Sequence, residues 1–268
     1  MKYDTIMLET VDGITTLTLN RPERLNAAND QMIGEFIDAI SYVDNDDKSR
    51  VLVITGAGRA FCSGVDVKDR FAVKIAESKE GKVSQERLGG RRMSGIACMM
   101  LPKLRQPVIA SVNGTAVGFG CALAVACDIR IASEEARFGM AFIKMGFVPD
   151  FGSTYYLPRL IGIAKACELT FTGRIVDARE AIEMGLVNQV VRAVDLKEST
   201  MELARVITNG PPLAMQVAKR GLYQGMNNDL ETQVQFETFA IPSLRMTEDH
   251  KEAVKAFMEK REPKFKGR

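Results

Sequence analysis

The sequence predicts an α/β core over residues 1–195 and an all-helical region over residues 196–268. Two patterns support this division. In the first part, short apolar runs typical of buried strands alternate with segments in which apolar residues recur at helical spacing. From residue 152 onward the helical spacing continues nearly to the end, with one strand-like segment at 187–191. The chain has 268 residues, 46% of them hydrophobic, which is enough for one large core.

The first elements are expected to be a hairpin and a helix. Apolar and polar residues alternate over 5–10 and 14–19, on both sides of the dipeptide Asp12-Gly13. This pattern predicts two strands joined by a tight turn. Over 29–43 the apolar residues recur every three or four positions, which predicts a helix with one buried face.

The middle of the chain is predicted to supply the remaining core strands, and its end a series of helices. Short continuous apolar runs indicate buried strands at 51–55, 108–112 and 129–132. The polar, Gly-rich stretch at 77–92 is expected to be a mobile loop, and 93–104 a Met-rich helix. Helical spacing in the last part predicts helices over 194–208, 212–224, 229–239 and 247–259.

Composition argues against several kinds of site. The net charge is +2 and the basic residues are spread along the chain, so no nucleic-acid partner is expected. The five cysteines form no C-x-x-C pair and His250 is the one histidine, which disfavours a zinc site and any Ser–His or Cys–His pair. We therefore expect no metal, and acid–base chemistry falls to Asp, Glu, Tyr or Lys.

The sequence also predicts a cytoplasmic protein. The N-terminus does not resemble a signal peptide, and no apolar run reaches the roughly 18 residues that a membrane span needs. An odd number of cysteines fits a reducing compartment. No membrane association is expected.

Two Gly-rich segments each follow a predicted buried strand, where α/β proteins place ligands. The first, 56–66, is also explained as an ordinary strand–helix turn with Asp66 as the helix N-cap. The second, 112–124, opens a helix of small residues near Gly118. It lacks the dinucleotide pattern because position 123 is Leu, and it lacks the P-loop lysine. NAD and ATP are thus poorly supported.

The two segments together could form an oxyanion hole. Each could present one backbone N–H group to the same oxygen atom. Such a pair of donors holds an enolate and so makes the C–H bonds next to a carbonyl more acidic.

Asp150 is the candidate acid at such a site. It lies in a turn fixed by Pro149 and Gly152. One interpretation is that it caps a helix over 153–160. The other is that its apolar flanks raise its pKa, so that it can both take and return a proton near neutral pH.

Short motifs with a characteristic order extend along nearly the whole chain. They are Asn20-Arg21-Pro22-Glu23-Arg24-Leu25-Asn26-Ala27, Ala60-Phe61-Cys62-Ser63-Gly64-Val65-Asp66, Asn113-Gly114, Gly118-Phe119-Gly120, Cys127-Asp128-Ile129-Arg130, Leu157-Pro158-Arg159-Leu160-Ile161-Gly162, Thr172-Gly173-Arg174, Gly185-Leu186-Val187 and Ala256-Phe257-Met258-Glu259-Lys260-Arg261. In order and spacing they resemble the crotonase family, also called enoyl-CoA hydratase/isomerase. The resemblance implies a β-β-α spiral core, a C-terminal helical trimerisation region, an acyl-CoA thioester as partner, and a homotrimer or dimer of trimers.

The resemblance also implies roles for individual positions. The family holds a thioester enolate with two backbone N–H groups, which would be those of Val65 and Phe119. Coenzyme A is then part of the substrate, and no separate cofactor is implied. Contacts to CoA or the acyl group would come from Arg24, Leu25, Ala27, Ala60, Ser63, Gly64, Asp66, Val67, Gly118, Met140 and Phe142. Phe257 and Lys260 would touch the CoA nucleotide of a neighbouring subunit.

Departures from the family pattern favour an isomerase. Hydratases of the family carry two glutamates, where this chain has Ala122 and Phe142. Adding water to a double bond needs one group to activate the water and another to handle the α-proton, and neither Ala nor Phe can do so. Asp150 lies where several family isomerases keep a single acid. Its surroundings look closest to the 1,2-epoxyphenylacetyl-CoA isomerase and Δ3,Δ2-enoyl-CoA isomerase types.

Two alternatives remain open at this point. The same scaffold could hydrate or hydrolyse an acyl-CoA, with Asp150 activating a water. The chain could also be a non-catalytic CoA-binding or RNA-binding relative, although its near-neutral charge argues against RNA.

Overall fold

The computed structural model describes residues 2–68 and 93–268, so the loop expected at 77–92 lies outside the described residues. A larger sheet has the strand order β1-β2-β3-β5-β7-β10 and a smaller one the order β4-β6-β8-β9. The larger sheet comprises β1 (Ile6–Val11), β2 (Ile14–Leu19), β3 (Val51–Gly56), β5 (Val108–Val112), β7 (Ile129–Ser133) and β10 (Gln189–Val191). The smaller comprises β4 (Ala60–Cys62), β6 (Thr115–Val117), β8 (Arg137–Gly139) and β9 (Val176–Asp177).

The chain passes from one sheet to the other in a repeating way. β3 continues into β4, β5 into β6, and β7 into β8. β4, β6 and β8 pair in parallel, so the loops that follow them emerge at the same edge of the smaller sheet. β1 with β2 and β8 with β9 are the antiparallel pairs. The predicted α/β spiral core is confirmed.

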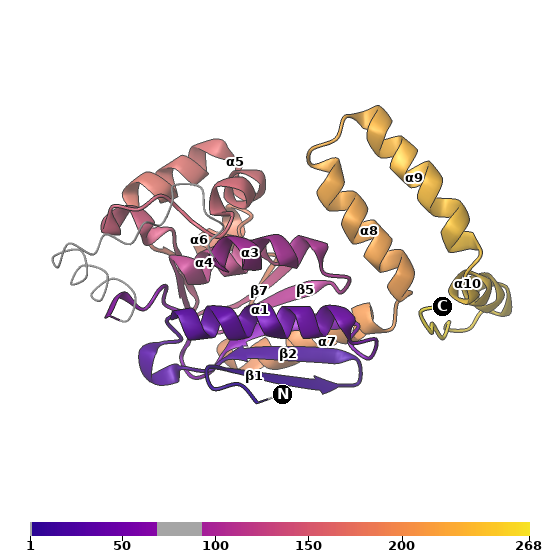
Figure 1. Cartoon of the computed structure of the whole chain (residues 1–268), viewed down its shortest axis with the longest axis horizontal. Helices are drawn as coiled ribbons and strands as arrows, with labels where there is room; N and C mark the ends of the chain where they lie inside the picture. Colours follow the sequence, from indigo (N-terminus) through magenta and orange to yellow (C-terminus); the bar gives the residue numbers. More distant parts are fainter. Residues whose placement is uncertain (1, 69–92) are drawn as a thin grey trace.

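Helices cover both faces of the larger sheet (Figure 1). On one face lie α1 (Asp30–Asn45), α3 (Met93–Met100, continued by a 3-10 turn at Leu101–Lys103) and α4 (Phe119–Ala126). Every residue of α4 is buried, which explains why this helix is built from small residues. On the other face α7 (Leu196–Thr208) packs against Val51, Val53 and Ile109.

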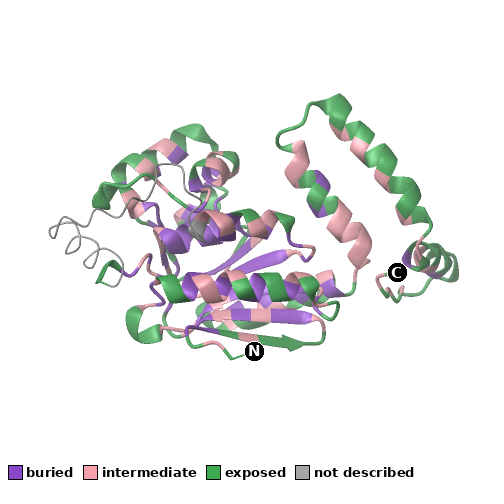
Figure 2. Cartoon of the chain, in the orientation of Figure 1, coloured by how far each residue is buried: buried purple, intermediate pink, exposed green. Residues whose placement is uncertain are grey.

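The last three helices form an arm at the end of the chain (Figure 1), and the first of them contacts the core through Lys219, which donates to the carbonyl of Gln106. They are α8 (Pro212–Gly225), α9 (Leu230–Arg245) and α10 (Glu248–Glu259). Figure 2 shows that α9 is largely exposed, and its exposed side chains include Leu230 and Phe239. The predicted helical C-terminal region is confirmed. The predicted boundary between core and helical region at residue 195 stays a prediction. The next helix, α7, also packs on the larger sheet.

The structure also corrects the expected elements. The short strands β4 and β6 lie inside the two Gly-rich segments and were not expected there. The helix expected to open near Gly118 is confirmed, because α4 begins at Phe119 with Gly118 as its N-cap. β8 and β9, with α6 (Ala178–Glu183) between β9 and β10, were not predicted either. α5 (Ser153–Thr172) starts as expected but runs on past a kink at Gly162, where φ is 76°. α9 passes through Pro242 instead of ending at 239.

Candidate active site

A cavity of about 390 Å³ lies where the loops after β4 and β6 meet the turn that carries Asp150. Its lining consists of Ser63, Gly64, Val65, Val67, Val117, Gly118, Phe119, Ala141, Phe142, Met145, Phe147, Val148, Pro149 and Asp150. Among these described residues Asp150 carries the sole ionisable side chain. The described part of the cavity lining is therefore mostly apolar and contains a single acid.

The loop after β4 is shaped by a glycine. Gly64 has a φ of 121°, and a Cβ atom there would lie 3.3 Å from the carbonyl oxygen of Val117. A side chain at this position would strain the backbone and crowd the neighbouring loop. The carbonyl of Gly64 accepts the N–H of Ala28 at 2.8 Å, and the N–H of Asp66 reaches the carbonyl of Ala28 at 2.9 Å. Val65 is thus held between two backbone hydrogen bonds.

The start of α4 is pressed against β4. Gly118 is the N-cap, with a φ of 54°, and its N–H donates to the carbonyl of Gly139 at 2.8 Å. A Cβ atom on Gly120 would stand 2.7 Å from the carbonyl carbon of Cys62, so this position must be glycine. The first helical residue, Phe119, therefore lies beside the loop after β4, and its ring packs edge-on against Phe151 at 5.0 Å.

Two backbone donors lie at this junction without an acceptor among the described residues. Within residues 2–68 and 93–268, no hydrogen bond of the N–H of Val65 or of the N–H of Phe119 is found. The first N–H groups of a helix have no intrahelical partner, which accounts for Phe119. Val65 forms an isolated parallel bridge with Ala28, in which Gly64 and Asp66 make the two hydrogen bonds to Ala28. The N–H of Val65 itself therefore points away from Ala28.

Asp150 is not a helix cap. α5 begins at Ser153 with Gly152 as its N-cap, and no side chain caps it. The Oδ1 atom of Asp150 accepts the N–H of Phe151 at 2.7 Å, and its carbonyl accepts the N–H and the hydroxyl of Ser153. Phe151 is fully buried beneath the turn. The helix-cap interpretation is wrong, and Asp150 lies on the cavity instead.

The structure brings together about half of the predicted site. Ser63, Gly64, Val65, Val67, Gly118, Phe119, Phe142 and Asp150 all line the cavity. Arg24 and Leu25 lie alongside, because their carbonyls accept hydrogen bonds from the hydroxyl and the N–H of Ser63. Ala27, Ala60 and Met140 are buried behind this surface.

The other predicted residues lie elsewhere. Asp66 is buried and pairs with Arg21 at 3.0 Å. Phe257 is 86% exposed on α10, and Lys260 ends that helix. Sequence reasoning missed Arg21 as a member of the site, although it belongs to the same motif as Arg24.

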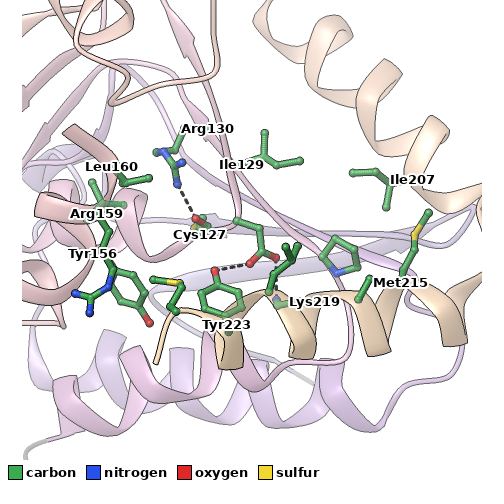
Figure 3. Close-up of a pocket in the computed structure, with 16 residues that line it drawn as sticks. Cys127, Ile129, Arg130, Tyr156, Arg159, Leu160, Ile207, Met215, Lys219 and Tyr223 are labelled. Atoms are coloured by element: carbon green, nitrogen blue, oxygen red, sulfur yellow. Dashed lines mark hydrogen bonds and ion pairs between the residues drawn. The ribbon is translucent and has the colours of Figure 1, made fainter. Parts of the chain in front are cut away.

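A second cavity, of about 470 Å³, lies between α8, α5 and the start of β7 (Figure 3). At its floor Asp128 accepts hydrogen bonds from Tyr223 at 2.6 Å and from the N–H of Val108 at 2.7 Å, and it pairs with Lys219 at 2.8 Å. Burial lowers the pKa of Lys219 and raises that of Tyr223. Because these polar groups satisfy one another, they anchor α8 to the sheet.

Neither a metal nor a membrane is indicated by the described parts of the chain. They contain no group of three or more His, Cys, Asp or Glu side chains that could hold a metal ion. None of their helices is both long and apolar enough to cross a membrane.

Comparisons with known proteins agree on one family. The model for the enoyl-CoA hydratase/isomerase family matches residues 9–268. The chain is 39% identical to the 1,2-epoxyphenylacetyl-CoA isomerase of Escherichia coli, covering 96% of each chain. It is 36% identical to the short-chain-enoyl-CoA hydratase of Clostridium acetobutylicum, covering 97% of each. The names of these relatives divide between isomerase and hydratase.

The fold comparison gives the same result. A crystal structure of an enoyl-CoA hydratase from Bacillus anthracis superimposes with a TM-score of 0.90 and 36% sequence identity. The match covers 99% of this chain and 100% of the other.

Proposed function

The chain belongs to the enoyl-CoA hydratase/isomerase family, and within that family we propose that it is an isomerase that moves a proton along an enoyl-CoA thioester. Asp150 is proposed as the one acid. The N–H groups of Val65 and Phe119 are proposed as the donors that hold the enolate oxygen.

One observation carries this proposal. Asp150 is the single ionisable side chain among the described residues that line the cavity, and the cavity also contains Val65 and Phe119. A 1,3 proton shift needs one group that takes a proton and returns it, whereas hydration needs two. The two positions at which the family hydratases are expected to carry glutamates hold Ala122, which is buried, and Phe142, which lines the cavity.

The proposed reaction has two steps. Asp150 removes a proton from the carbon next to the thioester carbonyl or from its vinylogous position. The electron pair of that C–H bond moves into the conjugated system, and the oxygen, now negatively charged, accepts hydrogen bonds from Val65 and Phe119. Asp150 then returns the proton to the other carbon, so the double bond moves and no atom is gained or lost.

The remaining predicted residues are proposed to hold the CoA part of the substrate. Arg24, Leu25 and Ser63 lie at the edge of the cavity, where a CoA chain would leave it. The exposed apolar side chains on α8 and α9, such as Leu222 and Phe239, support assembly into the proposed trimer or dimer of trimers. In that assembly Phe257 and Lys260 would reach the CoA nucleotide of a neighbouring subunit.

The experiment supplies 3-enoyl-CoA and 2-enoyl-CoA thioesters to the wild type and to Asp150→Asn. The proposal expects the wild type to move the double bond, detected by NMR, with no change in product mass. Asp150→Asn should lose this activity while keeping its substrate affinity.

The same experiment decides the alternative that the hydratase names of relatives favour. A product heavier by one water would make the chain a hydratase. Free CoA would make it a hydrolase. Binding without any turnover would make it a non-catalytic relative.

A further inference from the structure

A buried ion pair lies beside the proposed enolate site, and the proposed mechanism does not use it. The Nη2 atom of Arg21 lies 3.0 Å from Oδ2 of Asp66, and the two side chains are 12% and 6% exposed. Asp66 directly follows Val65, the residue whose N–H is one of the two proposed donors. Val65 and Val67 are among the described residues that line the cavity, whereas Asp66 is not.

The segment that carries Arg21 is tied to the backbone on both sides of Val65. Nη1 of Arg21 donates to the carbonyl of Ala27 at 2.6 Å. The next residue, Ala28, donates to Gly64 at 2.8 Å and accepts from Asp66 at 2.9 Å. These two bonds turn the N–H of Val65 away from Ala28. The ion pair adds a side-chain contact between the same two segments, because Arg21 binds both the carbonyl of Ala27 and the carboxylate of Asp66.

The loop that carries Arg21, residues 20–27, is called the Arg21 loop, and hydrogen bonds of Asn26 hold it in place. The side-chain amide of Asn26 donates to the carbonyls of Ala57 at 2.9 Å and Ala60 at 2.7 Å. Oδ1 of Asn26 accepts the N–H of Arg21 at 2.9 Å. Arg21 therefore projects from a loop that is fastened to the segment leading into β4, and it can fix the position of Asp66.

We propose that the Arg21–Asp66 pair is a positioning device, which holds the backbone of Val65 so that its N–H points at the thioester oxygen. This inference rests on the proposed function. A buried ion pair is a weak source of stability, but it specifies one geometry, which is what a hydrogen-bond donor in a catalytic site requires. Arg21 and Asp66 are thus positioning residues, and Asp66 acts behind the CoA groove.

The first test is the kinetics of Asp66→Asn, which keeps the size of the side chain and removes its charge. A displaced donor slows the reaction without weakening binding, so kcat should fall about ten- to hundredfold while KM changes less than about twofold. Arg21→Lys keeps the positive charge but not the planar guanidinium group, so its kcat should fall less than that of Asp66→Asn. Asp195→Asn, which breaks the exposed pair with Arg192, is the matched control and should change neither constant.

The second test measures the hydrogen bonding of the thioester carbonyl by infrared spectroscopy. Butyryl-CoA labelled with ¹³C at the thioester carbonyl is bound to each variant, and its infrared band is recorded. Donors that polarise the carbonyl lower the frequency of this band. The shift should be smaller in Asp66→Asn than in the wild type and unchanged in Asp150→Asn. A folded Asp66→Asn protein with the full shift and wild-type kcat would overturn the inference.

The double variant Arg21→Gln/Asp66→Asn covers the case in which a single variant does not fold. It leaves neither charge buried without its partner. Because both residues act on the same N–H, its kcat should also fall about ten- to hundredfold while KM changes less than about twofold, and a folded double variant with wild-type kcat would overturn the inference. Where both single variants fold, additive losses would overturn it as well. If Asp150→Asn remains active, the proposed function fails, and the carbonyl band still decides the role of the pair.

Discussion

A Cβ atom on Gly118 would lie 3.8 Å from the Cα of Gly64, so the loops after β4 and β6 touch at their glycines. This contact sets Val65 and Phe119 side by side on one cavity. The relationship follows from the parallel pairing of β4 and β6, which brings both loops to the same edge of the smaller sheet. The geometry of the proposed donors therefore depends on how closely the two loops approach.

Gly120→Ala tests this close approach. The added Cβ would stand 2.7 Å from the carbonyl carbon of Cys62, so α4 must move away from β4. Overpacking of this kind costs about 1–3 kcal/mol. We expect a lower free energy of unfolding in urea and a lower kcat. Gly34→Ala in α1 is the control, since nothing lies within 4 Å of its Cβ, and it should be neutral or slightly stabilising. Equal effects of the two variants would contradict the account.

The anchor of α8 is expected to matter for stability and not for chemistry. Asp128→Ala leaves the ammonium group of Lys219, which is 7% exposed, without its carboxylate. Breaking a buried pair costs about 3–5 kcal/mol, whereas Tyr223→Phe removes one hydrogen bond to a charged group and costs about 1.5–3 kcal/mol. Urea denaturation measures both. Asp128→Ala/Lys219→Met should recover part of the loss, and a kcat that falls in Tyr223→Phe would refute a purely structural role.

The carboxylate of Glu35 on α1, which binds Thr5 just before β1, should make the stability of the fold depend on pH. Burial opposes the ionisation of Glu35, but hydrogen bonds from the hydroxyl and N–H of Thr5 and from Gln31 outweigh it and hold the pKa of Glu35 below 4.5. Because the folded-state pKa is lower than that of the unfolded chain, the carboxylate stabilises the fold above about pH 4.5. This contribution is lost as the pH falls through the folded-state pKa.

The measurement is the difference in unfolding free energy between the wild type and Glu35→Gln across acidic pH. It should be largest near neutral pH and shrink steadily below about pH 4.5. A difference that does not change with pH would show that the hydrogen bonds do not depend on the charge of Glu35.

Phe257 tests the proposed contact with the CoA nucleotide. Stacking of a base on an aromatic ring is worth about 1–3 kcal/mol, so Phe257→Ala should raise KM for an acyl-CoA by about tenfold. KM for the corresponding acyl-pantetheine, which lacks the nucleotide, should not change. Phe171→Ala removes another exposed ring, on α5, and should leave both constants unchanged. Equal rises for both substrates would place Phe257 elsewhere in the site.

The sequence predicted the long elements well because their apolar spacing is strong. The helices of the C-terminal region and the strands β3, β5 and β7 all lie close to their expected positions. It missed β4, β6 and β8 because each has three residues, too few for a periodic signal, and because glycines around β4 and β6 suggest loops. Their pairing depends on the spiral and not on local preference.

The site was predicted unevenly for a similar reason. Local signals identified Gly64, Gly118 and Asp150, since glycines and a lone acid stand out in one chain. The burial of Asp66 against Arg21 could not be read in this way, because the two residues are far apart in sequence and meet only when the Arg21 loop folds over β4. The roles of the predicted site residues stay predictions.

Transfer of deuterium from solvent is the most direct test of a single-acid, enolate-forming mechanism. The wild type, Asp150→Asn and the control Asp195→Asn are incubated with a 2-enoyl-CoA in deuterated water, and the thioester is analysed by mass spectrometry and NMR. We expect the wild type and the control to incorporate deuterium at the α- or γ-carbon without adding water. Asp150→Asn should exchange about 10²–10⁴-fold more slowly. Exchange at the wild-type rate in Asp150→Asn, or a product that has gained a water, would contradict the account.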